Sequence, residues 1–82
     1  MATHTHRFVE EYEGLVGFGL DRPTDESTVR VYLQTFADDA LMRELLPRLS
    51  DAELSDLFDA MNRLMRRHLS EDEYHRLFLK QE

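Results

Sequence analysis

The stretch from Ser50 to Leu69 constrains the fold more than any other part of the chain. It opens with a capping box, in which the Ser50 hydroxyl accepts from the backbone N–H of Glu53 and the Glu53 carboxylate accepts from the N–H of Ser50. A helix is therefore expected to begin at Asp51. Behind this cap, apolar residues recur at helical spacing in one stripe, made of Leu54, Leu57, Phe58, Met61, Leu64, Met65 and Leu69.

Charge is segregated along the same stretch. Acids fill its first half and bases its second half, namely Asp51, Glu53, Asp56 and Asp59, then Arg63, Arg66, Arg67 and His68. This order opposes the helix macrodipole at both ends and favours one continuous helix over residues 51–69. A second capping box, from Ser70 to Glu73, follows at once. A further helix should therefore begin at Glu71 and run to about Leu79.

Three shorter helical segments are expected before this stretch, and no alternating strand pattern competes with them. The predicted fold class is all-α, a compact bundle of four to five short helices with helix 51–69 central. Pro23 is taken as a break before the second of the three segments. In the last helix Tyr74 is expected to face inward and His75 to pair with Glu71. The expected segments run from His6 to between Gly14 and Gly17, from Asp25 to Ala37 behind a Thr24 cap, and from an Asp38 cap to about Leu46, before Pro47.

Length and cysteine content indicate how such a domain gains stability. A chain of 82 residues is expected to form a single domain over residues 1–82, with residues 1–5 as a flexible tail. It contains no cysteine, so neither a disulfide nor a thiolate metal site can reinforce a thin core. Small domains of this kind often gain burial by associating, and a homodimer is expected. The candidate self-association residues are Leu41, Met42, Leu45, Met61 and Met65.

Net charge and hydropathy disfavour two classes of partner. A formal net charge of −7 at pH 7 argues against nucleic acid, whose phosphates require Lys and Arg. A helix-turn-helix regulator is the least favoured alternative, since the helix from Asp51 begins with acids. No long apolar run is present to span a membrane, and the first residues lack the basic start and apolar core of a signal peptide, so the cytoplasm is the expected compartment.

The polar residues give little support to catalysis. Ser50 and Ser70 are used as helix caps, and no Ser/His/acid set is suggested by the remaining serines. The carboxylates lie on polar helix faces, where general acid–base chemistry is not favoured. We therefore expect neither an enzyme nor a cofactor.

Metal binding at the N-terminus is one alternative function. If Met1 is removed, Ala2-Thr3-His4 offers a free amine, two amide nitrogens and an imidazole, which can surround square-planar Cu(II) or Ni(II). His4 is the candidate ligand. The competing interpretation is a loose tail that matches a permissive pattern by chance.

Anion binding is the other alternative. Basic residues concentrate where the last two helices meet, at Arg63, Arg66, Arg67, His68 and Arg76. Their forked donors suit a small anion or an acidic partner. The competing interpretation is that they complement the helix dipole and pair with the acidic first turn of the last helix.

Three sequence phrases resemble those of short, uncharacterised bacterial cytoplasmic helical proteins. They are Gly17-Phe-Gly-Leu-Asp-Arg-Pro23, Leu46-Pro-Arg-Leu-Ser-Asp-Ala-Glu-Leu54 and His68-Leu-Ser-Glu-Asp-Glu-Tyr-His-Arg-Leu-Phe78. This resemblance implies a cytoplasmic helical protein and carries no activity, cofactor or site residue. The expected function is therefore a non-enzymatic protein-interaction or regulatory module, with a second copy of itself, or also another protein, as partner.

Overall fold

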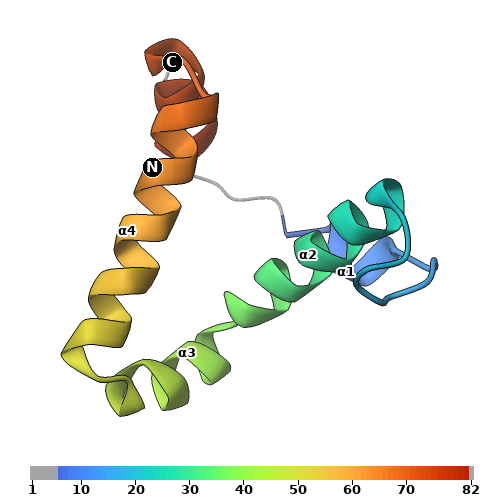
Figure 1. Cartoon of the computed structure of the whole chain (residues 1–82), viewed down its shortest axis with the longest axis horizontal. Helices are drawn as coiled ribbons and strands as arrows, with labels where there is room; N and C mark the ends of the chain where they lie inside the picture. Colours follow the sequence, from blue (N-terminus) through green and yellow to red (C-terminus); the bar gives the residue numbers. More distant parts are fainter. Residues whose placement is uncertain (1–5, 82) are drawn as a thin grey trace. The chain divides into compact units, whose positions relative to one another are not determined.

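Helices make up all the regular structure of residues 6–81, the part of the chain that the computed structural model describes (Figure 1). Within that range no strand occurs, so the predicted all-α class is confirmed. No helix in this range is both long and apolar enough to cross a membrane. The elements are α1 (Phe8–Glu11), α2 (Arg22–Phe36), α3 (Asp39–Leu45), the 3-10 turn η1 (Leu46–Arg48), α4 (Asp51–His68), α5 (Glu71–Glu73) and the π-helical turn η2 (Tyr74–Phe78).

The described residues form two compact units, each held together by contacts among its own residues. The N-terminal unit comprises residues 6–47 and holds α1, α2 and α3, whereas the C-terminal unit comprises residues 48–81 and holds α4, α5 and η2. The expectation that the other helices pack round α4 stays a prediction.

Helix α2 begins earlier than the sequence predicted. Its N-cap is Asp21, whose carboxylate accepts from the Thr24 backbone N–H at 2.9 Å and from the Thr24 hydroxyl at 3.1 Å. Thr24 was expected to be the cap, because Pro23 was taken as a break. Proline is tolerated in the first turn of a helix, where its missing N–H has no partner to lose. Pro23 therefore lies inside α2, not before it.

Helix α1 is held against α2 by two contacts. The Val9 backbone N–H donates to the Gln34 side-chain oxygen at 2.9 Å. The Arg30 guanidinium lies 4.1 Å from the centre of the Phe8 ring, in cation–π geometry. The Phe8 ring also stacks on Tyr12, with ring centres 5.0 Å apart.

The first helix is shorter than predicted and ends at Glu11. Tyr12 already has an extended backbone, with ψ at 122°, and its hydroxyl donates to the Leu15 carbonyl at 2.9 Å. The Tyr12 ring thus lies over the turn, in the space that a Cβ at Gly14 would occupy. A Cβ at position 14 would displace this ring and with it the hydrogen bond to Leu15.

Thr28 on α2 fixes the apolar loop that follows. Its hydroxyl accepts from the Gly17 N–H at 3.0 Å and donates to the Gly17 carbonyl at 3.2 Å. In the first turn of α2, the Asp25 carboxylate accepts from the Gly19 N–H at 2.7 Å. Thr28 is the one buried residue among the described residues, at 4% exposure. Hydrogen bonds to Thr28 and Asp25, not an apolar cluster, therefore join this loop to α2.

The C-terminal unit confirms both predicted capping boxes. The hydroxyls of Ser50 and Ser70 each accept from the backbone N–H three residues on at 3.1 Å, and the backbone N–H of each serine donates to the carboxylate of that glutamate at 2.8 Å. Helix α4 begins at Asp51 as predicted and ends at His68, one residue before the expected Leu69, which is its C-cap. The Asp38 cap of α3 is also confirmed, and Pro47 lies in the 3-10 turn η1.

The last helix departs from the predicted single α-helix over residues 71–79. After one α-helical turn in α5, η2 widens to a π-helical turn in which the Leu79 N–H donates to the Tyr74 carbonyl at 3.1 Å. The Tyr74 and Phe78 rings stack there, 5.3 Å apart. Lys80 then takes a left-handed φ of 59°, which ends the helix.

Replacing Thr28 by valine should loosen the loop. Thr28→Val keeps the shape of the side chain but removes both bonds to Gly17, so we expect a loss of about 1–3 kcal/mol in unfolding free energy. The control is Thr35→Val, because the Thr35 hydroxyl donates to Val31 within the exposed part of α2 and its loss should cost about 0.5 kcal/mol or less. Urea unfolding followed by circular dichroism measures both; equal midpoints would contradict the role given to Thr28.

Removing the first capping box should weaken α4. Ser50→Ala deletes the acceptor for the Glu53 N–H and should destabilise the helix by about 0.5–2 kcal/mol. Ser55→Ala, within the exposed helix, is the matched control and should be neutral or slightly stabilising, because alanine has the higher helix propensity. Thermal unfolding of the two variants decides between them; a smaller loss for Ser50→Ala than for Ser55→Ala would refute the cap.

Candidate functional site

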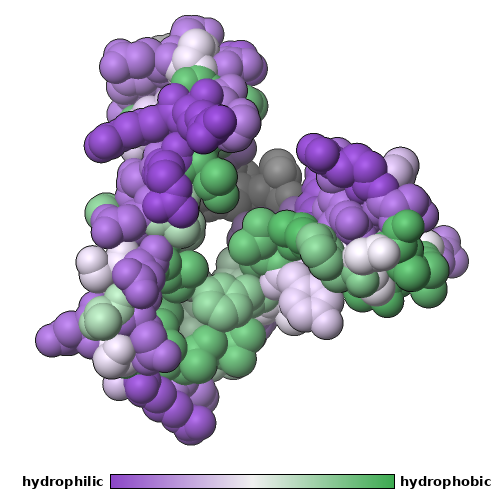
Figure 2. Space-filling model, viewed as in Figure 1, coloured by the Kyte–Doolittle hydropathy of each residue, from purple (hydrophilic) through white to green (hydrophobic). Residues whose placement is uncertain are grey.

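Helix α4 presents an exposed apolar face. The side chains of Leu54, Phe58, Met61 and Leu64 are 41%, 64%, 47% and 55% exposed. Figure 2 shows hydrophobic side chains gathered on one side of α4 and hydrophilic ones on the other. We call the face formed by Leu54, Leu57, Phe58, Met61, Leu64 and Met65 the α4 stripe.

The N-terminal unit also leaves many large apolar side chains exposed. Phe18, in the loop that Thr28 anchors, is 73% exposed, and Leu33 on α2 is 61% exposed. No apolar side chain of residues 6–81 is fully buried. The remaining exposed ones of this unit are Leu15, Val16, Leu20, Val29, Tyr32 and Leu41.

The predicted self-association residues fall into two groups. Met61 and Met65 lie on the α4 stripe, with Met65 half-buried. Leu41, Met42 and Leu45 lie on α3, in the other unit. Leu41 lines a shallow apolar hollow together with four residues of α2, which are Val31, Tyr32, Thr35 and Phe36.

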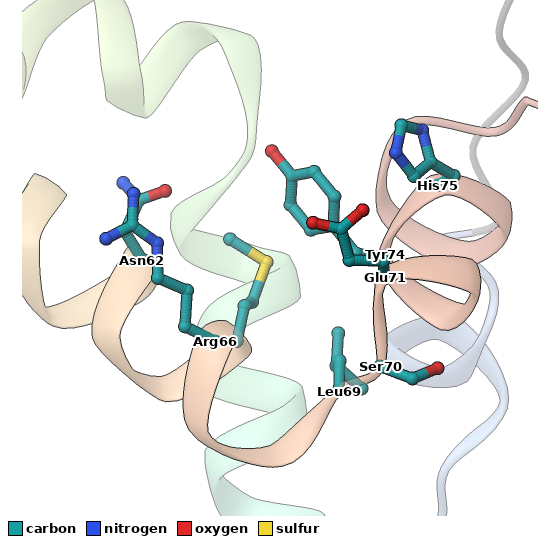
Figure 3. Close-up of a pocket in the computed structure, with 8 residues that line it drawn as sticks. Asn62, Arg66, Leu69, Ser70, Glu71, Tyr74 and His75 are labelled. Carbon is teal, nitrogen blue, oxygen red and sulfur yellow. The ribbon is translucent and has the colours of Figure 1, made fainter.

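A corner hollow of about 370 Å³ opens where α4 turns into α5 (Figure 3). Asn62 and Arg66 lie side by side on α4, and Glu71 and Tyr74 extend toward them from the last helix. Because one wall carries a guanidinium and the other a carboxylate, the hollow has mixed charge. Its lining residues are Asn62, Met65, Arg66, Leu69, Ser70, Glu71, Tyr74 and His75.

The predicted basic cluster is brought together only in part. Arg63, Arg66 and Arg67 line a second, shallow hollow along α4, in which Asp59 also takes part. Arg76 instead lies on the last helix, where it pairs with Asp72 at 3.7 Å. His68 ends α4 in its basic last turn, as predicted for a complement to the helix dipole.

Two histidine predictions have different outcomes. His4 lies outside the described residues, so its role as a Cu(II) or Ni(II) ligand stays a prediction. His75 was expected to pair with Glu71; instead its Nδ1 lies 2.9 Å from the Gln81 side-chain oxygen. Among residues 6–81 no group of three or more His, Asp or Glu side chains is placed to hold a metal ion.

The capping hydrogen bonds of Glu73 at the corner change the pKa of its carboxyl group. The Ser70 backbone N–H, which donates to the Glu73 carboxylate, lowers the pKa of Glu73 below its usual value. The Ser70 side chain and the positive charge of Arg76 lower it further. A capping carboxylate held in its charged form stabilises the helix start, which accounts for this shift without any catalytic role.

The corner hollow was missed by sequence reasoning. Tyr74 was predicted to face inward, and Asn62 and Glu71 were given no shared role, yet all three line the hollow. A usable signal was present in the sequence. Two capping boxes with only Leu69 between the end of one helix and the next cap require a sharp corner, and a corner brings the ends of both helices together.

Comparison with protein-family models, with curated proteins and with solved structures finds no match to this chain. Its function is therefore inferred from its own residues.

The capping carboxylate predicts how the corner responds to acid. The depressed pKa means that the box stabilises the corner above the pKa of an unfolded glutamate and loses that contribution as pH falls through the lower, folded value. The Ser70 amide proton should report this titration in NMR spectra recorded from about pH 6 to about pH 3. Glu73→Gln should abolish it and Glu71→Gln should leave it in place; persistence in Glu73→Gln would disprove the assignment.

Proposed function

We propose that this chain is a non-enzymatic interaction module that associates with a second copy of itself. The observation that carries this proposal is the α4 stripe, an exposed apolar face on the longest helix, opposite a charged face. Contiguous exposed apolar surface rimmed by polar residues is typical of protein interaction sites.

Size supports the same function. The described C-terminal unit spans only residues 48–81, near the length below which a fold usually needs disulfides, metals or association. The chain has no cysteine, so disulfides are not available to it. Most of the stability of a helix in a protein comes from packing of its apolar face, and the α4 stripe is such a face.

The polar groups of the corner hollow favour binding over catalysis. The Ser70 hydroxyl accepts from the Glu73 N–H, and the lowered pKa of Glu73 keeps that group charged, whereas a general acid needs a raised pKa. The His75 Nδ1 lies 2.9 Å from the Gln81 side-chain oxygen. Each of these side chains is thus accounted for by the structure of the corner.

Self-association is tested by molar mass from light scattering on a size-exclusion column, in a dilution series down to low micromolar. The full chain should run as a dimer that dissociates on dilution. Phe58→Ser, which removes the most exposed side chain of the stripe, should raise the dissociation constant at least about tenfold, since burying a Phe side chain contributes about 1.5–3 kcal/mol.

Ala52→Ser is the matched control for that experiment. It places the same residue on α4, nine residues before Met61 and so half a turn away from the stripe, and should leave the dissociation constant within about twofold. A chain that is monomeric at every concentration, or equal effects of the two variants, would reject self-association through α4.

Anion binding is a second candidate, and the grouping of Arg63, Arg66 and Arg67 along one hollow favours it. Forked guanidinium donors match the oxygens of a small anion. Inorganic phosphate should then raise the melting temperature saturably, and Arg67→Ala should abolish that rise. No shift in the unmodified chain would exclude this function.

A further inference from the structure

We propose that two copies of this chain pair through α4 in antiparallel orientation, with the acidic half of each helix against the basic half of the other. This inference rests on the proposed function, since it specifies the geometry of the same self-association. The surface involved is the α4 stripe together with one of its charged edges. The partner that fits this surface is a second copy of the chain.

The edge of the stripe has a simple order. Beside Leu57 and Leu64 lie Glu53, Ala60 and Arg67, each seven residues after the one before. Positions repeated every seven residues stay on one side of a helix that packs along another helix, and they flank its apolar contact. From the N-terminal to the C-terminal end of this edge of α4, an acidic residue is therefore followed by a small residue and then by a basic one.

Antiparallel pairing makes this edge complementary to itself. When Ala60 lies against Ala60 of the second copy, the seven-residue spacing on either side places Glu53 against Arg67 of the second copy, and Arg67 against its Glu53. The apolar residues follow the same symmetry, because Leu54 then lies near Leu64 of the second copy. Small side chains at the middle let the helices approach, while opposite charges meet at both ends.

Parallel pairing would give the opposite result. The acidic first halves of two α4 helices would lie side by side, and so would the arginines of their second halves. Like charges at the edge of a helix pair are destabilising and set orientation against that arrangement. The charge segregation of α4 therefore selects one orientation while the apolar stripe supplies the attraction.

A second copy suits this surface better than a partner of one charge. A uniformly acidic protein would meet Glu53 and Asp51, and a uniformly basic one would meet Arg66 and Arg67. Only a partner with both signs in reverse order complements the whole length of α4. The α4 helix of a second copy, in antiparallel orientation, has its charges in that reverse order.

Charge reversal at the edge tests the pairing in solution. Arg67→Glu sets a carboxylate against Glu53 at both ends of the antiparallel pair, so at about 20 mM salt the dimer dissociation constant should rise at least about fivefold, and most of this rise should vanish at about 0.5 M salt. Arg63→Glu is the matched control. It makes the same charge change nine residues after Leu54, two and a half turns on, and so farther from the α4 stripe than Arg67 is. Its dissociation constant should stay within about twofold.

Orientation is measured directly by spin labels in the full-length dimer. The chain has no cysteine, so Ala52→Cys and Asp59→Cys each give one labelled site per copy, and both sites lie on the polar side of α4, away from the contact at Ala60. In the antiparallel pair, labels at position 52 are offset along the helix axes by about 24 Å, whereas labels at position 59 are offset by only about 3 Å. Electron-electron double resonance should accordingly return a longer distance for position 52 than for position 59.

The outcomes separate this inference from the proposed function. A monomer by light scattering overturns both, including the case in which the stripe is covered by the chain's own N-terminal unit. A dimer whose two label distances are equal overturns antiparallel pairing and leaves self-association standing. A dimer in which Arg67→Glu and Arg63→Glu have the same effect likewise overturns the charged edge as the determinant of orientation.

Discussion

Side-chain capping of helix N-termini is the interaction on which the structure depends. In α2, α3, α4 and α5 an aspartate or serine accepts from a backbone N–H within the first turn. The first N–H groups of a helix have no partner within the helix, so each cap fixes both where the helix begins and how the chain enters it. With no apolar side chain fully buried among residues 6–81, these local bonds carry a larger share of the organisation than a core does.

The sequence predicted elements well where a local rule decided them. The two serine boxes and the Asp38 cap act over three residues, and all were found. The predictions failed where two local rules competed, or where a contact with a distant residue determined the local structure. Pro23 was compatible with a break before a helix and with a place in its first turn, and the Asp21 carboxylate selected the second. The end of α1 depends on the Tyr12 ring. The hydrogen bonds between Thr28 and Gly17 join residues eleven positions apart, and no periodicity in the sequence reveals them.

The candidate surface was predictable for the same reason. The apolar stripe and the charge order of α4 follow from residue spacing on one helix, so Met61 and Met65 lie on the stripe, and Arg63, Arg66 and Arg67 lie together along one hollow. The corner hollow was not predicted, because it depends on the angle between α4 and α5 at Leu69 and Ser70. Sequence spacing places residues round one helix axis, but it does not give the direction in which the next helix leaves.

The charge order of α4 also determines over what range the helix is recognised. The middle of its acidic half and the middle of its basic half lie about 16 Å apart along the axis. At physiological ionic strength the field of an exposed charge decays over about 8 Å, so neither half is felt strongly at the other. An approaching molecule therefore meets two separate surfaces of opposite charge on α4, with the uncharged Ala60 between them, and does not sense only the small net charge of the whole helix.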